Sequence, residues 1–130
     1  MQRDKGKAGA GERAEFISKI SKEDYAHYNA NLRGVDINHN FGAGWDILHE
    51  QERANRIFGP APRQYGGPRP FSEPETRAVC GFISTFDIAR LWSFHSQGEV
   101  IYWQFQDYDI PGARELGEAF AQTSGYALED

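Results

Sequence analysis

The segment that most restricts the fold lies at residues 59–70, where seven of twelve residues are proline or glycine. Proline has no amide hydrogen and fixes its own φ, so this composition excludes a helix or a central strand. We therefore expect an extended surface loop, of a length that is often functional inside a compact domain. The residues concerned are Gly59, Pro60, Pro62, Gly66, Gly67, Pro68 and Pro70.

A helix start signal follows this loop. Ser72 is predicted as the N-cap, Glu75 three residues later would close a capping box, and Pro74 falls in the first turn, where its missing donor costs nothing. Apolar residues then recur at spacings of three, four and seven, which predicts one stripe that packs on a sheet. They are Val79, Phe82, Ile83 and Phe86, after which Asp87 is expected to end the helix.

Two apolar runs after this helix predict strands on either side of a histidine. Residues 88–94 are expected to form a mostly buried strand and residues 100–105 a second one, with Ser96-Gln97-Gly98 as the break. His95 would then lie at the exit of a buried strand, where open α/β sheets place ligands and catalytic groups. From position alone, a purely local hydrogen-bonding role for His95 is equally compatible with the sequence.

Two other helices are predicted, a short one at residues 46–53 and a last one at residues 112–123. Pro111 opens the last helix and Gly125 stands at its stop. The order helix, strand, turn, strand, helix indicates the α/β class.

The N-terminal part carries weaker signals. Residues 15–31 are compatible with a helix, with Ser21 as a candidate N-cap. Residues 1–14 hold almost no large apolar side chain and are predicted to be a flexible tail, because they cannot offset their ordering entropy by burial. The folded domain is therefore expected at residues 15–130.

The composition of the chain restricts the kinds of partner that it can bind. A length of 130 residues suits one domain, and a net charge of -5 does not suggest a polyanion-binding surface, so no nucleic-acid partner is expected. The apolar runs fall far short of the roughly 20 residues that a membrane-spanning helix requires. The first residues do not resemble a signal peptide, so we expect no membrane association and a cytoplasmic location for the chain as it stands.

Residues 31–41 are the second informative stretch, because Val35 and Ile37 alternate there with polar residues. This alternation fits a brief edge strand that aims its polar side chains to one side. An Asx-rich turn, in which the same side chains satisfy local backbone groups, is the alternative. The polar side chains are Asp36, Asn38 and Asn40.

Three stretches occur in the same order as in one known family. They are residues 33–41, then Tyr-Gly-Gly-Pro and Pro-Phe-Ser-Glu-Pro-Glu-Thr within residues 65–76, then Phe-His-Ser-Gln-Gly-Glu at residues 94–99. Over roughly residues 28–128 the chain resembles the zinc carboxypeptidase family typified by carboxypeptidase A. Within it, the chain is similar to the bacterial gamma-D-glutamyl-meso-diaminopimelate peptidases, which cut peptidoglycan stem peptides. The implied fold is part of a mixed β-sheet flanked by helices, incomplete in this chain.

The resemblance implies roles for four residues. His95 matches the third zinc ligand, and Asn38 matches an asparagine that binds the terminal carboxylate of the substrate. His39 stands where most members have an arginine that pairs with this carboxylate. Histidine lacks the bidentate guanidinium group of arginine, so the usual specificity for a C-terminal amino acid is not expected. Arg33 is a candidate counterpart of the arginine that stabilises the oxyanion.

The resemblance also implies groups that this chain lacks. The family's first two zinc ligands form a His-x-x-Glu motif well before the Asn-rich stretch, and no such motif is expected at any of the four histidines of this chain. The catalytic glutamate lies in the family's last third, beyond Asp130, and Glu99 is not expected to replace it. Zinc is thus the implied cofactor with one retained ligand, whereas a catalytic zinc site keeps three protein ligands. We expect the isolated chain to be inactive.

Two hypotheses follow from these observations. The first is that the chain is the middle portion of a zinc-dependent metallopeptidase that acts on peptidoglycan peptides. The second is that it is a metal-free truncated remnant that serves as a peptide-binding or interaction module, through Asn38, His39 and residues 59–70. The partner is a peptide in both cases. A middle portion is also expected to associate or aggregate through exposed sheet edges.

Overall fold

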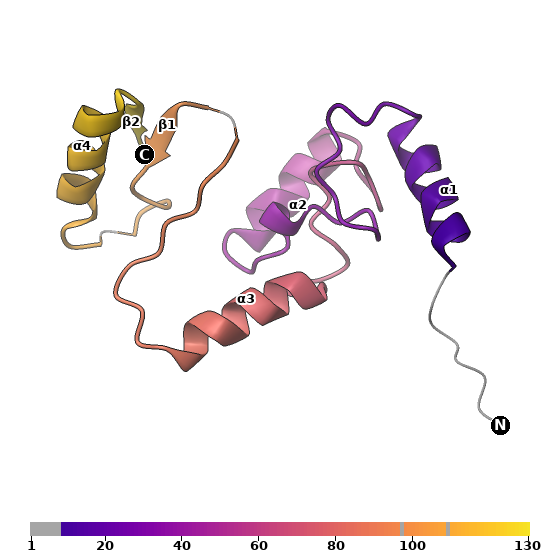
Figure 1. The fold of residues 1–130 in the computed structure, drawn as a ribbon, viewed down its shortest axis with the longest axis horizontal. Helices are drawn as coiled ribbons and strands as arrows, with labels where there is room; N and C mark the ends of the chain where they lie inside the picture. The colour runs from indigo at the N-terminus through magenta and orange to yellow at the C-terminus, as the bar shows by residue number, and fades with distance from the viewer. Residues whose placement is uncertain (1–8, 97, 109) are drawn as a thin grey trace. The chain divides into compact units, whose positions relative to one another are not determined.

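The computed structural model describes residues 9–96, 98–108 and 110–130, and the chain divides into two compact units between Ile88 and Ala89. The described residues form helices and a small parallel sheet, which confirms the α/β class (Figure 1). The elements are α1 (Ala10–Ser21), the 3-10 helix η1 (Ile37–His39), α2 (Trp45–Ala54), α3 (Pro74–Thr85), β1 (Val100–Tyr102), α4 (Ala113–Ser124) and β2 (Ala127–Glu129).

Helix α1 lies earlier in the chain than the sequence predicts. Its first turn is closed by Glu12, whose Oε2 accepts a hydrogen bond from the Gly9 amide at 2.7 Å. Ser21 is the last residue of the helix, so its prediction as an N-cap is wrong. Lys22 follows in the left-handed region with φ of 52°, and this conformation ends the helix. The helix also includes residues 10–14 of the predicted tail, and residues 1–8 lie outside the described residues.

Helices α2 and α3 lie where the sequence predicts them. Helix α2 exceeds the predicted range by one residue at each end, and α3 begins at Pro74. The predicted capping box of α3 is wrong, because Glu73 occupies the N-cap position and no side chain caps the helix. The Ser72 hydroxyl donates instead to Glu73 Oε1 at 2.8 Å, inside a buried polar network.

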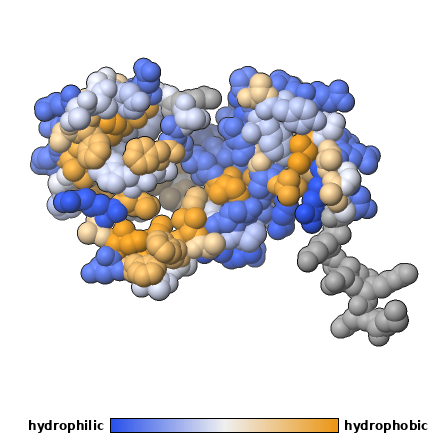
Figure 2. Space-filling model, viewed as in Figure 1, coloured by the Kyte–Doolittle hydropathy of each residue, from blue (hydrophilic) through white to orange (hydrophobic). Residues whose placement is uncertain are grey.

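The apolar stripe of α3 is open to solvent. Val79, Phe82 and Phe86 are 46%, 62% and 56% exposed, and the rings of Phe82 and Phe86 contact each other at 4.7 Å between centroids. Figure 2 shows hydrophobic residues gathered at the surface in the region of α3. Among the described residues, the unit that holds α3 contains no sheet, so the prediction that this stripe packs on a sheet is not met within that unit.

The second unit holds the sheet. Strands β1 and β2 pair in parallel, with Val100 opposite Ala127, and α4 packs on both. Gly117 is buried at this contact, where an added Cβ would lie 3.0 Å from Trp103 Cβ and 2.9 Å from Leu128 Cδ1. Glycine therefore allows α4 to approach the strands closely. Helix α4 agrees with its predicted range within one residue at each end, and Gly125 stands in the left-handed region at its C-terminus.

The predicted strand at residues 88–94 is wrong. These residues have no regular structure, and Phe94 is 90% exposed. A strand persists only where a neighbour pairs with its backbone, and among the described residues none pairs with this segment. Of the second predicted strand, residues 100–102 are confirmed. Gln97, in the predicted break, lies outside the described residues.

The centre of the first unit is polar. Val35, which is 3% exposed, is the one apolar residue that is fully buried among the described residues, whereas several polar residues are. They are Ser21, Asp36, Asn40, Glu52, Ser72, Glu73 and Thr76. Hydrogen bonding between distant segments therefore has a large part in holding this unit together. Separately, none of the helices described is long and apolar enough to cross a membrane.

Candidate functional site

The Asn-rich stretch is a turn of 3-10 helix, so the predicted edge strand is wrong. Asp36 makes one isolated bridge with Ala30, and η1 begins directly after it. In η1 the polar side chains do not share one side: Asp36 and Asn40 are buried, whereas Asn38 is exposed. The alternative, an Asx-rich turn in which these same side chains satisfy local backbone groups, is not met at Asp36 and Asn40, whose side chains bond to residues 64–76. Local bonding of this kind occurs instead at Asn31, whose Oδ1 accepts from the amides of residues 33 and 35.

Asn40 lies at the centre of the buried network and has no exposed surface. Its Nδ2 donates to the Gly66 carbonyl oxygen at 2.5 Å and to Ser72 Oγ at 2.8 Å. Its Oδ1 accepts from the Glu73 amide at 3.1 Å and from the Thr76 hydroxyl. A buried amide is costly unless its donors and acceptors are paired, and both ends of this one are paired. Asn40 thus connects the end of η1 to the loop at residues 59–70 and to the first turn of α3.

Glu73 is a fully buried carboxylate beside Asn40. Its Oε2 accepts from Asn31 Nδ2 at 2.8 Å, and its Oε1 accepts from Ser72 Oγ at the same distance. Arg33 supplies the cation, with Nε 3.5 Å from Glu73 Oε2 and a side chain that is 62% exposed. Three partners therefore compensate a charge that would be strongly unfavourable if it were buried alone.

Asn38 and His39 are neighbours in η1 with different surroundings. Asn38 is exposed, and the His39 side chain is 29% exposed. His39 Nε2 lies 3.8 Å from Asp36 Oδ2, which also accepts from the Gln64 amide at 2.8 Å. The buried carboxylate of Asp36 therefore anchors residues 59–70 and lies close to the imidazole of His39.

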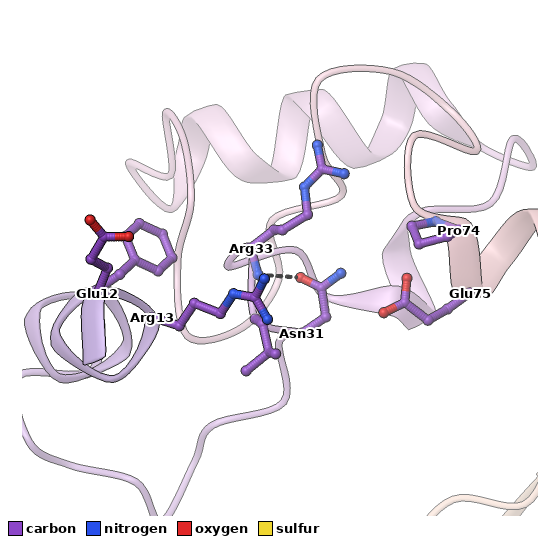
Figure 3. A pocket seen from close by; sticks show the side chains of 8 residues that line it. Glu12, Arg13, Asn31, Arg33, Pro74 and Glu75 are labelled. Carbon is purple, nitrogen blue, oxygen red and sulfur yellow. Dashed lines mark hydrogen bonds between the residues drawn. The ribbon is translucent and has the colours of Figure 1, made fainter. Parts of the chain in front are cut away.

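A hollow of about 610 Å³ lies beside Arg33. Figure 3 shows Glu12 and Arg13 entering it from α1, and Pro74 and Glu75 from the first turn of α3. Two arginines and two glutamates line it together with apolar side chains, so it presents both charge signs to a ligand. The lining residues are Glu12, Arg13, Phe16, Asn31, Leu32, Arg33, Pro74 and Glu75.

The expectation that no histidine begins a His-x-x-Glu motif is wrong, because His49 is followed by Glu52 three residues on, after the Asn-rich stretch. His49 Nδ1 and Glu52 Oε2 are 2.6 Å apart on α2, and Glu52 Oε1 accepts from the Gly66 amide at 2.7 Å. Glu52 Oε1 therefore holds the loop at residues 59–70 to α2, while Glu52 Oε2 contacts His49 within the same helix. Burial raises the pKa of the nearby Tyr65 phenol, and the charges of Glu52 and Glu73 raise it further.

His95 belongs to the second unit, whereas Arg33, Asn38 and His39 belong to the first. It is exposed, and its Nε2 lies 3.3 Å from Ser93 Oγ. In the part of the chain that the structure describes, no group of three or more His, Cys, Asp or Glu side chains could hold a metal ion. The structure thus brings three of the four predicted site residues into one compact unit.

Comparison with known proteins gives a consistent result. Residues 13–126 match the family model described as zinc carboxypeptidase. The chain is 35% identical over 106 residues to gamma-D-glutamyl-L-diamino acid endopeptidase 1 of Lysinibacillus sphaericus, which covers 82% of this chain and 26% of that protein. It is 37% identical over 98 residues to murein peptide amidase A of Escherichia coli K12, covering 72% and 36%.

Carboxypeptidase O of Bos taurus is 33% identical over 82 residues, covering 62% of this chain and 20% of that protein. The chain therefore spans between a fifth and about a third of the length of these relatives. No solved structure matches it significantly.

Proposed function

The chain belongs to the zinc carboxypeptidase family. On that premise we propose that it carries part of the substrate-binding surface of a zinc-dependent peptidase, formed by Arg33, Asn38 and His39. The fold proposed for the intact protein is the carboxypeptidase-like mixed sheet flanked by helices, of which residues 15–130 are one portion. The observation that carries the proposal is the fixed position of Asn38 and His39, which present a polar surface from η1 while buried Asn40 anchors it.

The proposed substrate is a peptidoglycan stem peptide, cut at the gamma-D-glutamyl-diaminopimelate bond. Two relatives support this choice by name, one a gamma-D-glutamyl-L-diamino acid endopeptidase and the other a murein peptide amidase. His39 in place of an arginine also supports it, because a single imidazole makes a weaker carboxylate clamp than a guanidinium.

Each retained residue has a proposed task. The exposed amide of Asn38 donates a hydrogen bond to a carboxylate of the substrate, and His39 contributes its imidazole beside it. Arg33 is proposed to stabilise the oxyanion, since a guanidinium offers several donors to developing negative charge. In the structure its Nε is held near Glu73, and no hydrogen bond joins its terminal nitrogens to another described residue.

The described residues do not fit a complete zinc site. No three candidate ligands come together among them, whereas catalytic zinc is held by three protein ligands. His95 is proposed as one ligand on the strength of its match to the family. The other ligands and the catalytic glutamate are proposed to come from portions of the protein that lie outside this chain.

Binding of a substrate-like peptide tests the proposed substrate-binding surface. The dipeptide gamma-D-glutamyl-meso-diaminopimelate should bind the 130-residue chain weakly and perturb the NMR signals of Asn38 and His39. Asn38→Ala and His39→Ala should each weaken binding by roughly 3- to 10-fold, the usual value of one or two hydrogen bonds. Asn55→Ala, an exposed change after α2, is the matched control and should leave the affinity unchanged. Perturbation of NMR signals from other residues alone would count against this substrate-binding surface.

We also propose that the isolated chain self-associates. The exposed stripe of α3 is apolar, and the edges of the two-stranded sheet are unpaired among the described residues. Light scattering should show a mass that rises with concentration, and Phe82→Ser should reduce it relative to the control Ser84→Ala. A monodisperse monomer at all concentrations would contradict the proposal.

A further inference from the structure

The starting observation is that Glu73 is fully buried although it carries a charge. Two of its partners, Asn31 Nδ2 and Ser72 Oγ, are neutral donors at 2.8 Å. Neutral donors alone satisfy the lone pairs of a carboxylate but leave its charge uncompensated. Arg33 is the one cation within 4 Å of this carboxylate among the described residues.

The second observation is the state of Arg33. Its Nε lies 3.5 Å from Glu73 Oε2, while 62% of its side chain is exposed and lines the hollow beside α3. A guanidinium has five N–H donors, and the contact with Glu73 is made from the Nε side. The terminal nitrogens make no hydrogen bond to any other residue in the part of the chain described, so they are available to an anionic group.

The third observation concerns the neighbours of Glu73. Its amide donates to Asn40 Oδ1 at 3.1 Å, so the residue that holds Arg33 is bonded to the one that anchors η1. Asn31, the other neighbour, also fixes the backbone of Arg33 by accepting from its amide at 2.9 Å. The first turn of α3 therefore sets the position of Arg33 relative to Asn38 and His39.

We propose that Glu73 is a positioning residue that acts through Arg33. It holds the guanidinium by its Nε side at the rim of the hollow, with the terminal nitrogens turned to an anionic group of the peptide substrate. This inference rests on the proposed function for the identity of that substrate, but the link between Glu73 and Arg33 is independent of it.

The test uses the 130-residue chain and the dipeptide gamma-D-glutamyl-meso-diaminopimelate. Glu73→Gln keeps the shape of the side chain and removes its charge. It should shift the Arg33 Nε–H NMR signal to that of a free arginine and weaken dipeptide binding by roughly 3- to 10-fold, as expected for a lost orienting ion pair. Glu50→Gln removes the same charge from an exposed position on α2 that does not line the hollow, and it is the matched control, with no shift of the Arg33 signal expected.

A double-mutant cycle separates positioning from a general structural role. In an Arg33→Ala background, Glu73→Gln should cause no further loss of dipeptide affinity. An equal loss in both backgrounds, or an unchanged Arg33 Nε–H signal, would overturn the proposal. If the dipeptide does not bind the wild-type chain, the proposed function fails, and the Nε–H signal alone decides the role of Glu73.

Wild-type relaxation data keep the proposal testable even if Glu73→Gln does not fold. The Nε–H of Arg33 should be as rigid as the backbone on the nanosecond timescale, whereas that of Arg56, an exposed arginine after α2 without an ion pair among the described residues, should be mobile. An Arg33 side chain as mobile as Arg56 would overturn the proposal.

Discussion

Replacement of Asn40 by alanine is expected to destabilise the first unit by about 3–5 kcal/mol, because it leaves several buried polar groups unpaired at 1–3 kcal/mol each. The groups left unpaired are the Gly66 carbonyl and the Glu73 amide, and the Thr76 hydroxyl keeps only its bond to the Glu73 carbonyl oxygen. Urea denaturation should show the loss in the free energy of unfolding. Hydrogen exchange should place it in residues 9–88, with residues 89–130 as the internal reference.

A second variant and a control variant test this prediction further. Asn40→Asp keeps the shape but cannot donate to Gly66, and it adds a carboxylate beside buried Glu73, so it should destabilise at least as much as alanine. Asn55→Ala, at an exposed site, should stay within about 0.5 kcal/mol of wild type. A cost below about 1 kcal/mol for Asn40→Ala would show that the network adds little to stability.

Replacement of Gly67 by alanine should cost about 2–4 kcal/mol, the sum of backbone strain and overpacking. Gly67 has φ of +95°, which side chains rarely adopt, and it is buried. An added Cβ would lie 2.5 Å from Ser72 Oγ and 2.9 Å from Asn40 Nδ2, so the network would have to open. The measurement is again the free energy of unfolding in urea.

Gly59→Ala is the matched control in the same loop. Nothing lies within 4 Å of an added Cβ at Gly59, so its effect should stay within about 0.5 kcal/mol. Equal effects at both positions would indicate that loop entropy, and not the contact with Asn40, explains the result at Gly67.

The sequence predicts those elements whose signals are local. Pro74 at a helix start and Gly125 at a helix stop act within one turn, so α3 and α4 could be located closely. The strand at residues 88–94 was mispredicted because pairing depends on a partner elsewhere in the chain. Strand β2 was missed for the same reason, since its three residues carry no pattern of their own.

The candidate site was predictable only in part. The resemblance singled out Arg33, Asn38 and His39, and the structure places all three in one unit. It did not indicate the task of Asn40, whose side-chain partners lie 26 to 36 residues away in the sequence. Glu73 was predicted only as part of a helix start, because its contact with Arg33 depends on the same long-range folding of the loop.

The central claim is that the chain carries part of a substrate-binding surface without a complete metal centre. An assay of zinc-dependent hydrolysis by the purified 130-residue chain tests this claim most directly. With gamma-D-glutamyl-meso-diaminopimelate and added zinc, we expect no cleavage above a protein-free control, although the dipeptide binds. Cleavage that a chelator and His95→Ala both abolish would contradict the claim, because it would show that the ligands within this chain suffice for catalysis.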